Sequence, residues 1–168
     1  MFSKSVSSVS AFASKKFKVP PSVTSKLTQP LLSHADIKDA EKANAASLEK
    51  INENLGSSWT LDFDYSSLAK ILKDEYPKSN VKAGVLSTNI LNGLSTEIAR
   101  LVRKDEKYKY KLAEEVSTIK GPKFVSKSEL QNGLHKTTIT DGSLVIYIAD
   151  TALTSELENV GYDLESSL

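Results

Sequence analysis

Two glycine-containing dipeptides divide residues 123–149 into three segments with β-strand character. They are Asn132-Gly133 and Asp141-Gly142. Both are strong signals for a type I′ hairpin turn, because that turn needs positive φ at both central residues and Asn, Asp and Gly tolerate it best. The spacing therefore predicts a three-stranded antiparallel meander, whose strands cover residues 124–131, 134–140 and 143–149.

Two-residue turns also fix which side chains lie opposite each other. Around the second turn, the predicted register contains three pairs: Ile139 with Leu144, Thr137 with Ile146, and His135 with Ile148. Around the first turn it places Glu129 opposite Lys136. Residues 144–148 are apolar or aromatic at every position, so both faces of this segment are apolar. That pattern indicates a central strand.

The rest of the chain adds one strand and several helices. Residues 59–65 alternate between large apolar and polar side chains, as a half-buried strand does. Helical periodicity predicts helices over residues 33–55, 82–104 and 105–115, and the second of these is the main helix. The sequence thus predicts an α+β domain over residues 34–168, with an antiparallel sheet of about four strands and helices packed on one face.

Residues 1–33 differ from the rest of the chain in charge. They contain five lysines and no acidic residue, whereas the remainder contains 17 basic and 21 acidic residues. A basic, serine-rich, acid-free leader with apolar residues at helical spacing is typical of a mitochondrial transit peptide, followed here by a linker. We therefore expect import into the mitochondrial matrix. The alternative is a disordered basic tail on a cytoplasmic protein, since transit peptides favour arginine and every positive charge here is lysine.

Composition narrows the possible chemistry. The chain has no cysteine, which excludes disulfides, thiolate nucleophiles and Cys-ligated metal centres. It has only two histidines and no phosphate-binding glycine loop, so we expect neither a metal centre nor a cofactor. No apolar run approaches the roughly 20 residues that a transmembrane helix needs, so no transmembrane segment is expected.

Two small sets of side chains are candidates for chemistry. Asp62 and Asp64 lie two apart on the predicted strand, so their carboxylates project from one face and form a weak candidate for a cation site. A solvated face is the favoured interpretation of this pair. His135 lies on the predicted apolar face, where it is a weak candidate for a general base beside the hydroxyl groups of that face. A hydrogen-bonded histidine at the edge of the core is the favoured alternative.

A third candidate is the basic stretch over residues 100–111. Basic side chains interleaved with aromatic ones can contact phosphates and stack on bases. The candidate binding residues are Arg100, Arg103, Lys104, Lys107, Tyr108 and Tyr110. Two acidic residues interrupt the run, which favours a solvated helix end and makes a nucleic-acid partner unexpected.

In the absence of a catalytic motif, we expect a non-enzymatic interaction or accessory module that acts through a protein partner in mitochondria. The alternative is a small acid–base enzyme or ligand-binding domain, with its site between the sheet and the main helix near His135. Polyanion binding through residues 100–111 is a third possibility. A filled interface between sheet and helix favours the first hypothesis, and a pocket that contains His135 favours the second.

Overall fold

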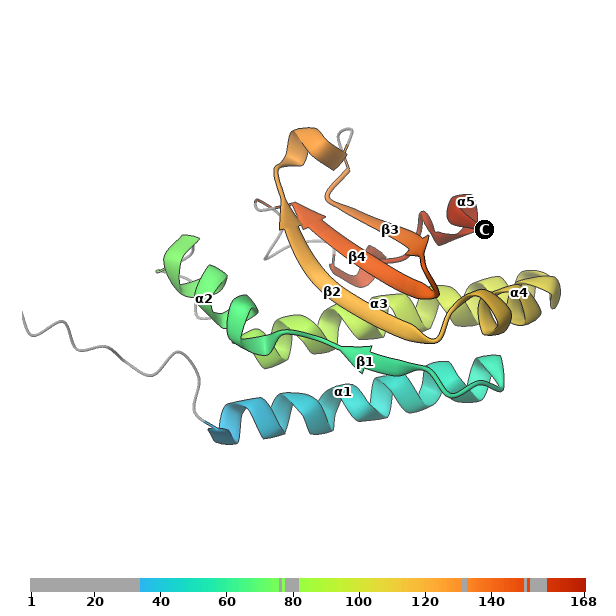
Figure 1. Ribbon diagram of the computed structural model, residues 1–168, viewed down its shortest axis with the longest axis horizontal. Coiled ribbons are helices and arrows are strands. Elements are labelled where there is room, and N and C mark those ends of the chain that lie inside the picture. The colour runs from blue at the N-terminus through green and yellow to red at the C-terminus, as the bar shows by residue number, and fades with distance from the viewer. Residues whose placement is uncertain (1–33, 76, 78–81, 131–132, 150, 152–156) are drawn as a thin grey trace, which may run out of the picture.

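The computed structural model describes residues 34–75, 77, 82–130, 133–149, 151 and 157–168 (Figure 1). The predicted leader and Asn132 of the first predicted turn lie outside this part of the chain. Helices and strands are interspersed along it, with three helices in succession between the first and second strands, and two short 3-10 helices complete it. The helices are α1 (His34–Leu55), α2 (Tyr65–Glu75), α3 (Ala83–Lys104), α4 (Lys107–Glu115) and α5 (Leu164–Ser167). The strands are β1 (Thr60–Asp62), β2 (Thr118–Val125), β3 (His135–Thr140) and β4 (Ser143–Ala149), and the 3-10 helices are η1 (Lys127–Leu130) and η2 (Leu157–Asn159).

The α+β class is confirmed, but the predicted antiparallel sheet is wrong. The four strands lie in the order β1-β2-β4-β3, and the sheet is mixed. β1 pairs parallel with β2, β2 pairs parallel with β4, and only β3 and β4 are antiparallel. β4 is therefore a central strand inserted between β2 and β3, as its apolar residues on both faces indicated.

The second predicted turn and its register are confirmed. All three predicted pairs occur, from Ile139 opposite Leu144 to His135 opposite Ile148. Asp141 and Gly142 have φ values of 49° and 71°, as a type I′ turn requires.

The first predicted hairpin does not form. Its first strand was expected over residues 124–131, but β2 ends at Val125 and the chain enters η1. Glu129 accepts hydrogen bonds from the backbone N–H and the hydroxyl of Ser126, at 3.1 and 2.8 Å. The bond from the Ser126 N–H is the carboxylate half of a capping box, and the Glu129 N–H donates to the Ser126 carbonyl at 3.0 Å, so the chain enters a helical turn and the strand ends. Glu129 consequently does not lie opposite Lys136, whose partner is Tyr147 of β4.

The strand predicted over residues 59–65 is shorter than expected. β1 covers only Thr60–Asp62, although the alternation of buried and exposed side chains continues through Tyr65. Asp64 ends the extended segment, because its carboxylate accepts hydrogen bonds from the backbone N–H and the hydroxyl of Ser67. That contact caps the first turn of α2.

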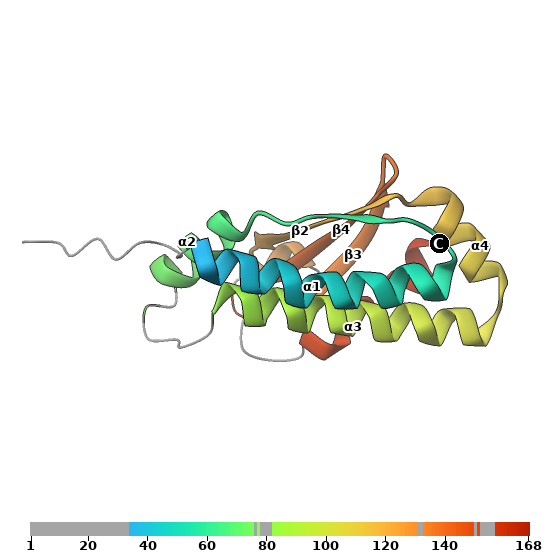
Figure 2. The same ribbon diagram turned by 90° about the horizontal axis from the view of Figure 1, so that it is seen from below.

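The hydrophobic core lies between the sheet and the two long helices. Figures 1 and 2 show α1 and α3 side by side on one side of the sheet. α3 contributes the largest share of fully buried side chains, including Leu86, Ile90, Leu94 and Ile98. These pack against apolar side chains of β2 and β4 in one cluster, so the space between the sheet and the main helix is filled.

The C-terminal segment lies along one border of the sheet and bonds it at one position. β3 is an edge strand, and its residue Thr137 is bonded by side chains rather than by another strand. The Thr137 N–H donates to Asp163 Oδ2 at 2.8 Å, and the Thr137 carbonyl accepts from Ser167 Oγ at 2.9 Å. Leu164, between these two residues, is fully buried and holds the segment in the core.

Candidate functional site

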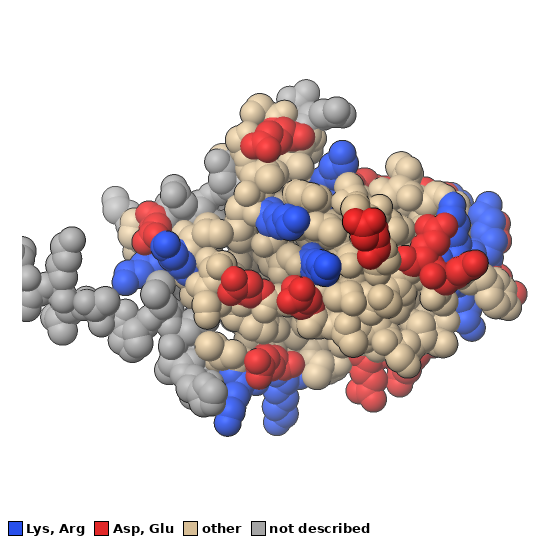
Figure 3. Space-filling model, in the orientation of Figure 1, with Lys and Arg blue, Asp and Glu red and all other residues tan. Residues whose placement is uncertain are grey.

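One face of the sheet has no helix over it. In Figure 1 this face is turned toward the viewer, and no helix crosses in front of β2, β4 and β3. The pairing places side chains on it in rows: Asp62, Lys120, Val145 and Thr138 form one row, and Lys123, Tyr147 and Lys136 form the next. Figure 3 shows basic side chains standing on this face with acidic ones close beside them, and Asp62 is the cross-strand neighbour of Lys120. We call Lys120, Lys123, Lys136 and Tyr147 the lysine face.

An irregularity in β2 creates the lysine face. In a regular strand, residues three apart point to opposite sides, so Lys120 and Lys123 would be separated by the sheet. Here three residues of β2 advance against two of β4, because Lys120 aligns with Val145 and Lys123 with Tyr147. The extra residue lies at Gly121-Pro122, as expected for proline and glycine in a bulged strand. Both lysines therefore point to the uncovered side.

Tyr147 lies at the centre of this face, half-buried between two lysines. Lys123 Nζ lies 5.7 Å from the centroid of its ring, and Lys136 is its partner across β3 and β4. Within the described part of the chain, none of Lys120, Lys123 and Lys136 forms an ion pair with a carboxylate. The lysine face therefore presents positive charge around an aromatic ring, and its lysines form no ion pair with a described carboxylate, although Asp62 lies in the row beside Lys120.

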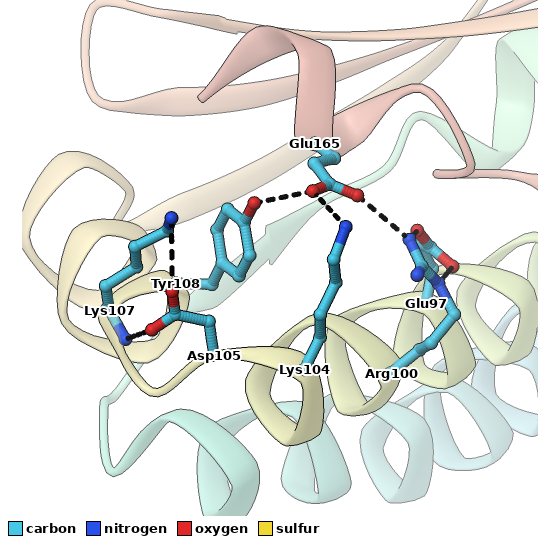
Figure 4. A network of polar contacts seen from close by, with 7 residues as sticks. All are labelled: Glu97, Arg100, Lys104, Asp105, Lys107, Tyr108 and Glu165. Atoms are coloured by element: carbon cyan, nitrogen blue, oxygen red, sulfur yellow. Dashed lines mark hydrogen bonds and ion pairs between the residues drawn. The ribbon is translucent and has the colours of Figure 1, made fainter.

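The basic stretch over residues 100–111 has the opposite character. Arg100 binds both carboxylate oxygens of Glu97, at 2.8 and 2.6 Å, and Lys104 binds Glu165 at 2.6 Å (Figure 4). Lys107 pairs with Asp105 at 3.1 Å. The other candidates are also engaged within the chain: Arg103 donates to the carbonyl of Ala99, Tyr108 to Glu165 and Tyr110 to Glu106. The structure thus brings Arg100, Lys104 and Tyr108 together around a carboxylate rather than leaving them open to a polyanion.

Glu165 links this stretch to the C-terminal segment. Its carboxylate accepts hydrogen bonds from Lys104 at 2.6 Å, from Tyr108 at 2.5 Å and from Arg100 at 3.4 Å. The hydrogen bonds from Lys104 and Tyr108 lower the pKa of Glu165 from its ordinary 4.5 to about 2. The same contact raises the pKa of Tyr108.

The lowered pKa predicts an acid-dependent loss of stability. A carboxyl group whose pKa is lower in the folded chain stabilises the fold above its unfolded pKa, and this contribution disappears as the pH falls through its folded pKa. For Glu165 the loss occurs between about pH 4.5 and pH 2. We expect Glu165→Gln to melt below the wild type at pH 7, and the two melting temperatures to converge as the pH falls to 2. Glu114→Gln is the control, because Glu114 forms no ion pair among the described residues, and parallel curves for Glu165→Gln would contradict the prediction.

His135 lines a pocket, but not the one expected. The sequence placed a possible site between the sheet and the main helix, and apolar side chains fill that space. His135 instead lines a pocket of about 660 Å³ at the border of β3, together with Leu130, Ile139, Asp163 and Ser167. This side chain is partly exposed.

Asp62 and Asp64 are both exposed, as expected of a solvated face. The hydrogen bonds from Ser67 hold the pKa of Asp64 below its usual range, and this carboxylate is used to cap α2. Across the described residues, no group of three or more histidine, aspartate or glutamate side chains is placed to hold a metal ion.

The predicted register of residues 134–140 against 143–149 implies Lys136 opposite Tyr147, as observed, but the sequence analysis missed Lys120 and Lys123 on the same face. The signal was present in Lys120-Gly-Pro-Lys123, since glycine and proline inside a strand mark a bulge.

No protein-family model matches this chain, and neither a curated protein nor a solved structure matches it. None of the described helices has both the length and the apolar character needed to span a membrane.

Proposed function

We propose that this protein is a non-enzymatic interaction module that binds an acidic surface of a protein partner through the lysine face. The observation that supports it is the contrast between two basic regions. Arg100 and Lys104 at the end of α3 are paired with carboxylates of the chain, whereas the lysines around Tyr147 form no ion pair with a carboxylate among the described residues. A positive face around an aromatic ring attracts a negatively charged partner and offers apolar area at its centre.

The composition of the lysine face favours a protein over a nucleic acid. Sheets that bind single strands use two or three aromatic side chains as stacking platforms. Along β1 to β4, Tyr147 is the one aromatic side chain on the uncovered side. Val145 beside it is buried at 6% exposure, so the apolar area offered to a partner is that of the Tyr147 ring.

Charge reversal tests the proposal. The double substitution Lys120→Glu and Lys123→Glu should weaken binding to the partner at least about tenfold, because two favourable charges become repulsive. The control is Lys70→Glu with Lys73→Glu, which makes the same change in net charge on the exposed side of α2. The measurement is the amount of partner recovered with the tagged full-length protein, quantified for the wild type and both double variants at two salt concentrations.

The proposal also predicts that recovery by the wild type falls at higher salt, since exposed charges are screened. Equal losses in both double variants would show a dependence on net charge alone. Full recovery by the Lys120/Lys123 variant would show that the partner binds elsewhere. Either result would overturn the proposal.

The proposed location is the mitochondrial matrix, supported by the charge and composition of residues 1–33. A fusion of residues 1–33 to a fluorescent protein should enter mitochondria. Replacing Lys4, Lys15, Lys16 and Lys18 with glutamate should prevent import, because import depends on positive charge. A diffuse cytosolic signal from the unaltered fusion would contradict this location.

A further inference from the structure

The edge strand β3 borders the lysine face, and its outward backbone groups can be identified. Thr140 and Ser143 flank the two-residue turn, so they form a hydrogen-bonded pair of the hairpin. Bonded pairs alternate with non-bonded ones in an antiparallel ladder, so the N–H and C=O groups of Ile139, Thr137 and His135 point away from β4. The bonds from Thr137 to Asp163 and Ser167 confirm this direction.

The C-terminal segment satisfies this edge only in part. Its side chains bond Thr137, whereas the outward N–H and C=O of Ile139 have no hydrogen-bond partner among the described residues. At the bonded position, Asp163 Oδ1 and Thr137 Oγ1 are buried without a hydrogen bond to any described residue. Unpaired buried polar atoms cost free energy, so these contacts are a poorer partner for the edge than a strand would be.

A pocket of about 660 Å³ runs along the same edge, within the usual range of about 300–1,000 Å³ for ligand sites. Its lining includes the β3 residues His135, Lys136, Thr138 and Ile139. The two sides of β3 differ. Lys136 and Thr138 belong to the uncovered face, whereas Ile139 points to the core side, where Leu130 also lines the pocket.

We infer that this edge binds an extended segment of the acidic partner, which pairs with β3 as an additional strand and alternates acidic with apolar residues. The inference rests on the proposed function and names the form of the partner. Side chains of an added strand point alternately to the two faces of the sheet. Those on the uncovered face lie beside Lys136 and are acidic, and those on the other face lie beside Ile139 and Leu130 and are apolar. The partner's strand forms backbone hydrogen bonds with the N–H and C=O of Ile139. At Thr137 its backbone takes the place of the Asp163 and Ser167 side chains.

A library of displayed ten-residue peptides, selected on the full-length protein, tests this inference. We expect the selected peptides to alternate acidic and apolar residues and to slow hydrogen exchange of the Ile139 amide, a readout that needs no variant. Lys136→Glu should weaken their binding at least about fivefold. Ser167→Ala should strengthen it, because one competing bond to Thr137 is removed.

A matched pair of variants isolates the backbone bond. Ile139→Pro removes an outward N–H that the hairpin does not use, whereas Ile139→Ala shortens the side chain and keeps that N–H. We expect a loss of at least about tenfold in Ile139→Pro and of less than about threefold in Ile139→Ala. Peptides that lack the alternation, or that leave exchange at Ile139 unchanged, would overturn the inference. If these peptides nevertheless bind more weakly to the Lys120→Glu, Lys123→Glu variant, the lysine face still binds acidic partners and only the added strand is wrong. If their binding to that variant is unchanged, the added strand and the proposed function are both wrong.

Discussion

Replacing Gly93 with alanine should lower the free energy of unfolding by about 2 kcal/mol, although the same change at an unobstructed helix position would raise it by about 1 kcal/mol. Gly93 lies in α3 where η2 crosses it. A Cβ at this position would lie 2.5 Å from the carbonyl oxygen of Leu157 and 3.1 Å from that of Glu158. Both obstacles are backbone atoms, so η2 would have to move away from the helix. Leu157 and Val160, which this movement would expose, are buried in the core.

Gly84→Ala is the matched control for this prediction. It lies in the same helix, but its Cβ would meet the Cβ of Ala40 at 3.0 Å and no backbone atom closer than 3.5 Å. Relieving that contact requires α1 to move by a few tenths of an ångström, because the Cβ of Ala40 is fixed to its backbone. The helix propensity gained with alanine offsets part of this cost, so we expect a change of less than about 1 kcal/mol. Thermal or urea unfolding of the three proteins provides the comparison. A Gly93→Ala variant as stable as the wild type would mean that η2 does not pack closely on α3.

Local signals predicted the parts of this fold that local geometry decides. The hairpin of β3 and β4 follows from Asp141-Gly142, because a two-residue turn leaves one register. The predictions for α1 and α3 agree with the structure to within one residue at each end, because their apolar periodicity is long. Neither the hairpin register nor the bounds of these two helices depend on which other helices or strands pack against them.

The first hairpin failed because two local signals competed. Asn132-Gly133 indicated a turn, while the spacing of Ser126 and Glu129 favoured a helical start, which their hydrogen bonds now stabilise. Once η1 forms, the chain leaves the sheet before reaching residue 132, and β3 returns on the far side of β4. The apolar character of β4 on both faces was the sign of this arrangement, because strands with neighbours on both sides and parallel pairing have that composition.

The candidate site was harder to predict than the fold, because the availability of a basic side chain to a partner depends on which carboxylates the fold places beside it. The run over residues 100–111 is the most basic stretch after the leader, yet Glu165 and Glu97 neutralise its centre (Figure 4). Glu165 lies far along the chain, so no local pattern announces the pairing. The lysine face shows the opposite relation between sequence and structure. Its lysines are far apart in the sequence, and the bulge in β2 and the parallel pairing of β2 with β4 bring them together.

Substituting Asn44 with alanine should lower the free energy of unfolding by about 2–3 kcal/mol. Asn44 is fully buried where α1 crosses α3 and the start of α2. Its amide donates to Tyr65 Oη at 2.6 Å and to Ser87 Oγ at 2.9 Å, and its carbonyl accepts from Thr88 Oγ1 at 2.9 Å. Burial raises the pKa of Tyr65, which keeps this phenol neutral as part of the network. The alanine variant would leave a cavity and remove three hydrogen bonds at a position where Asn44 and Ser87 are fully buried.

Asn92→Ala is the matched control, because it changes the same residue type at the same helix pair. Asn92 accepts one hydrogen bond from Ser47 at 2.7 Å, but it is exposed, so water can replace the lost partner. We expect a cost below about 1 kcal/mol there. Chemical unfolding of both variants measures the difference. Since the network joins three helices at fixed positions, Asn44→Ala should also broaden the amide resonances of Ser87 and Thr88. Equal losses of unfolding free energy in Asn44→Ala and Asn92→Ala would show that the buried network contributes nothing beyond an exposed hydrogen bond.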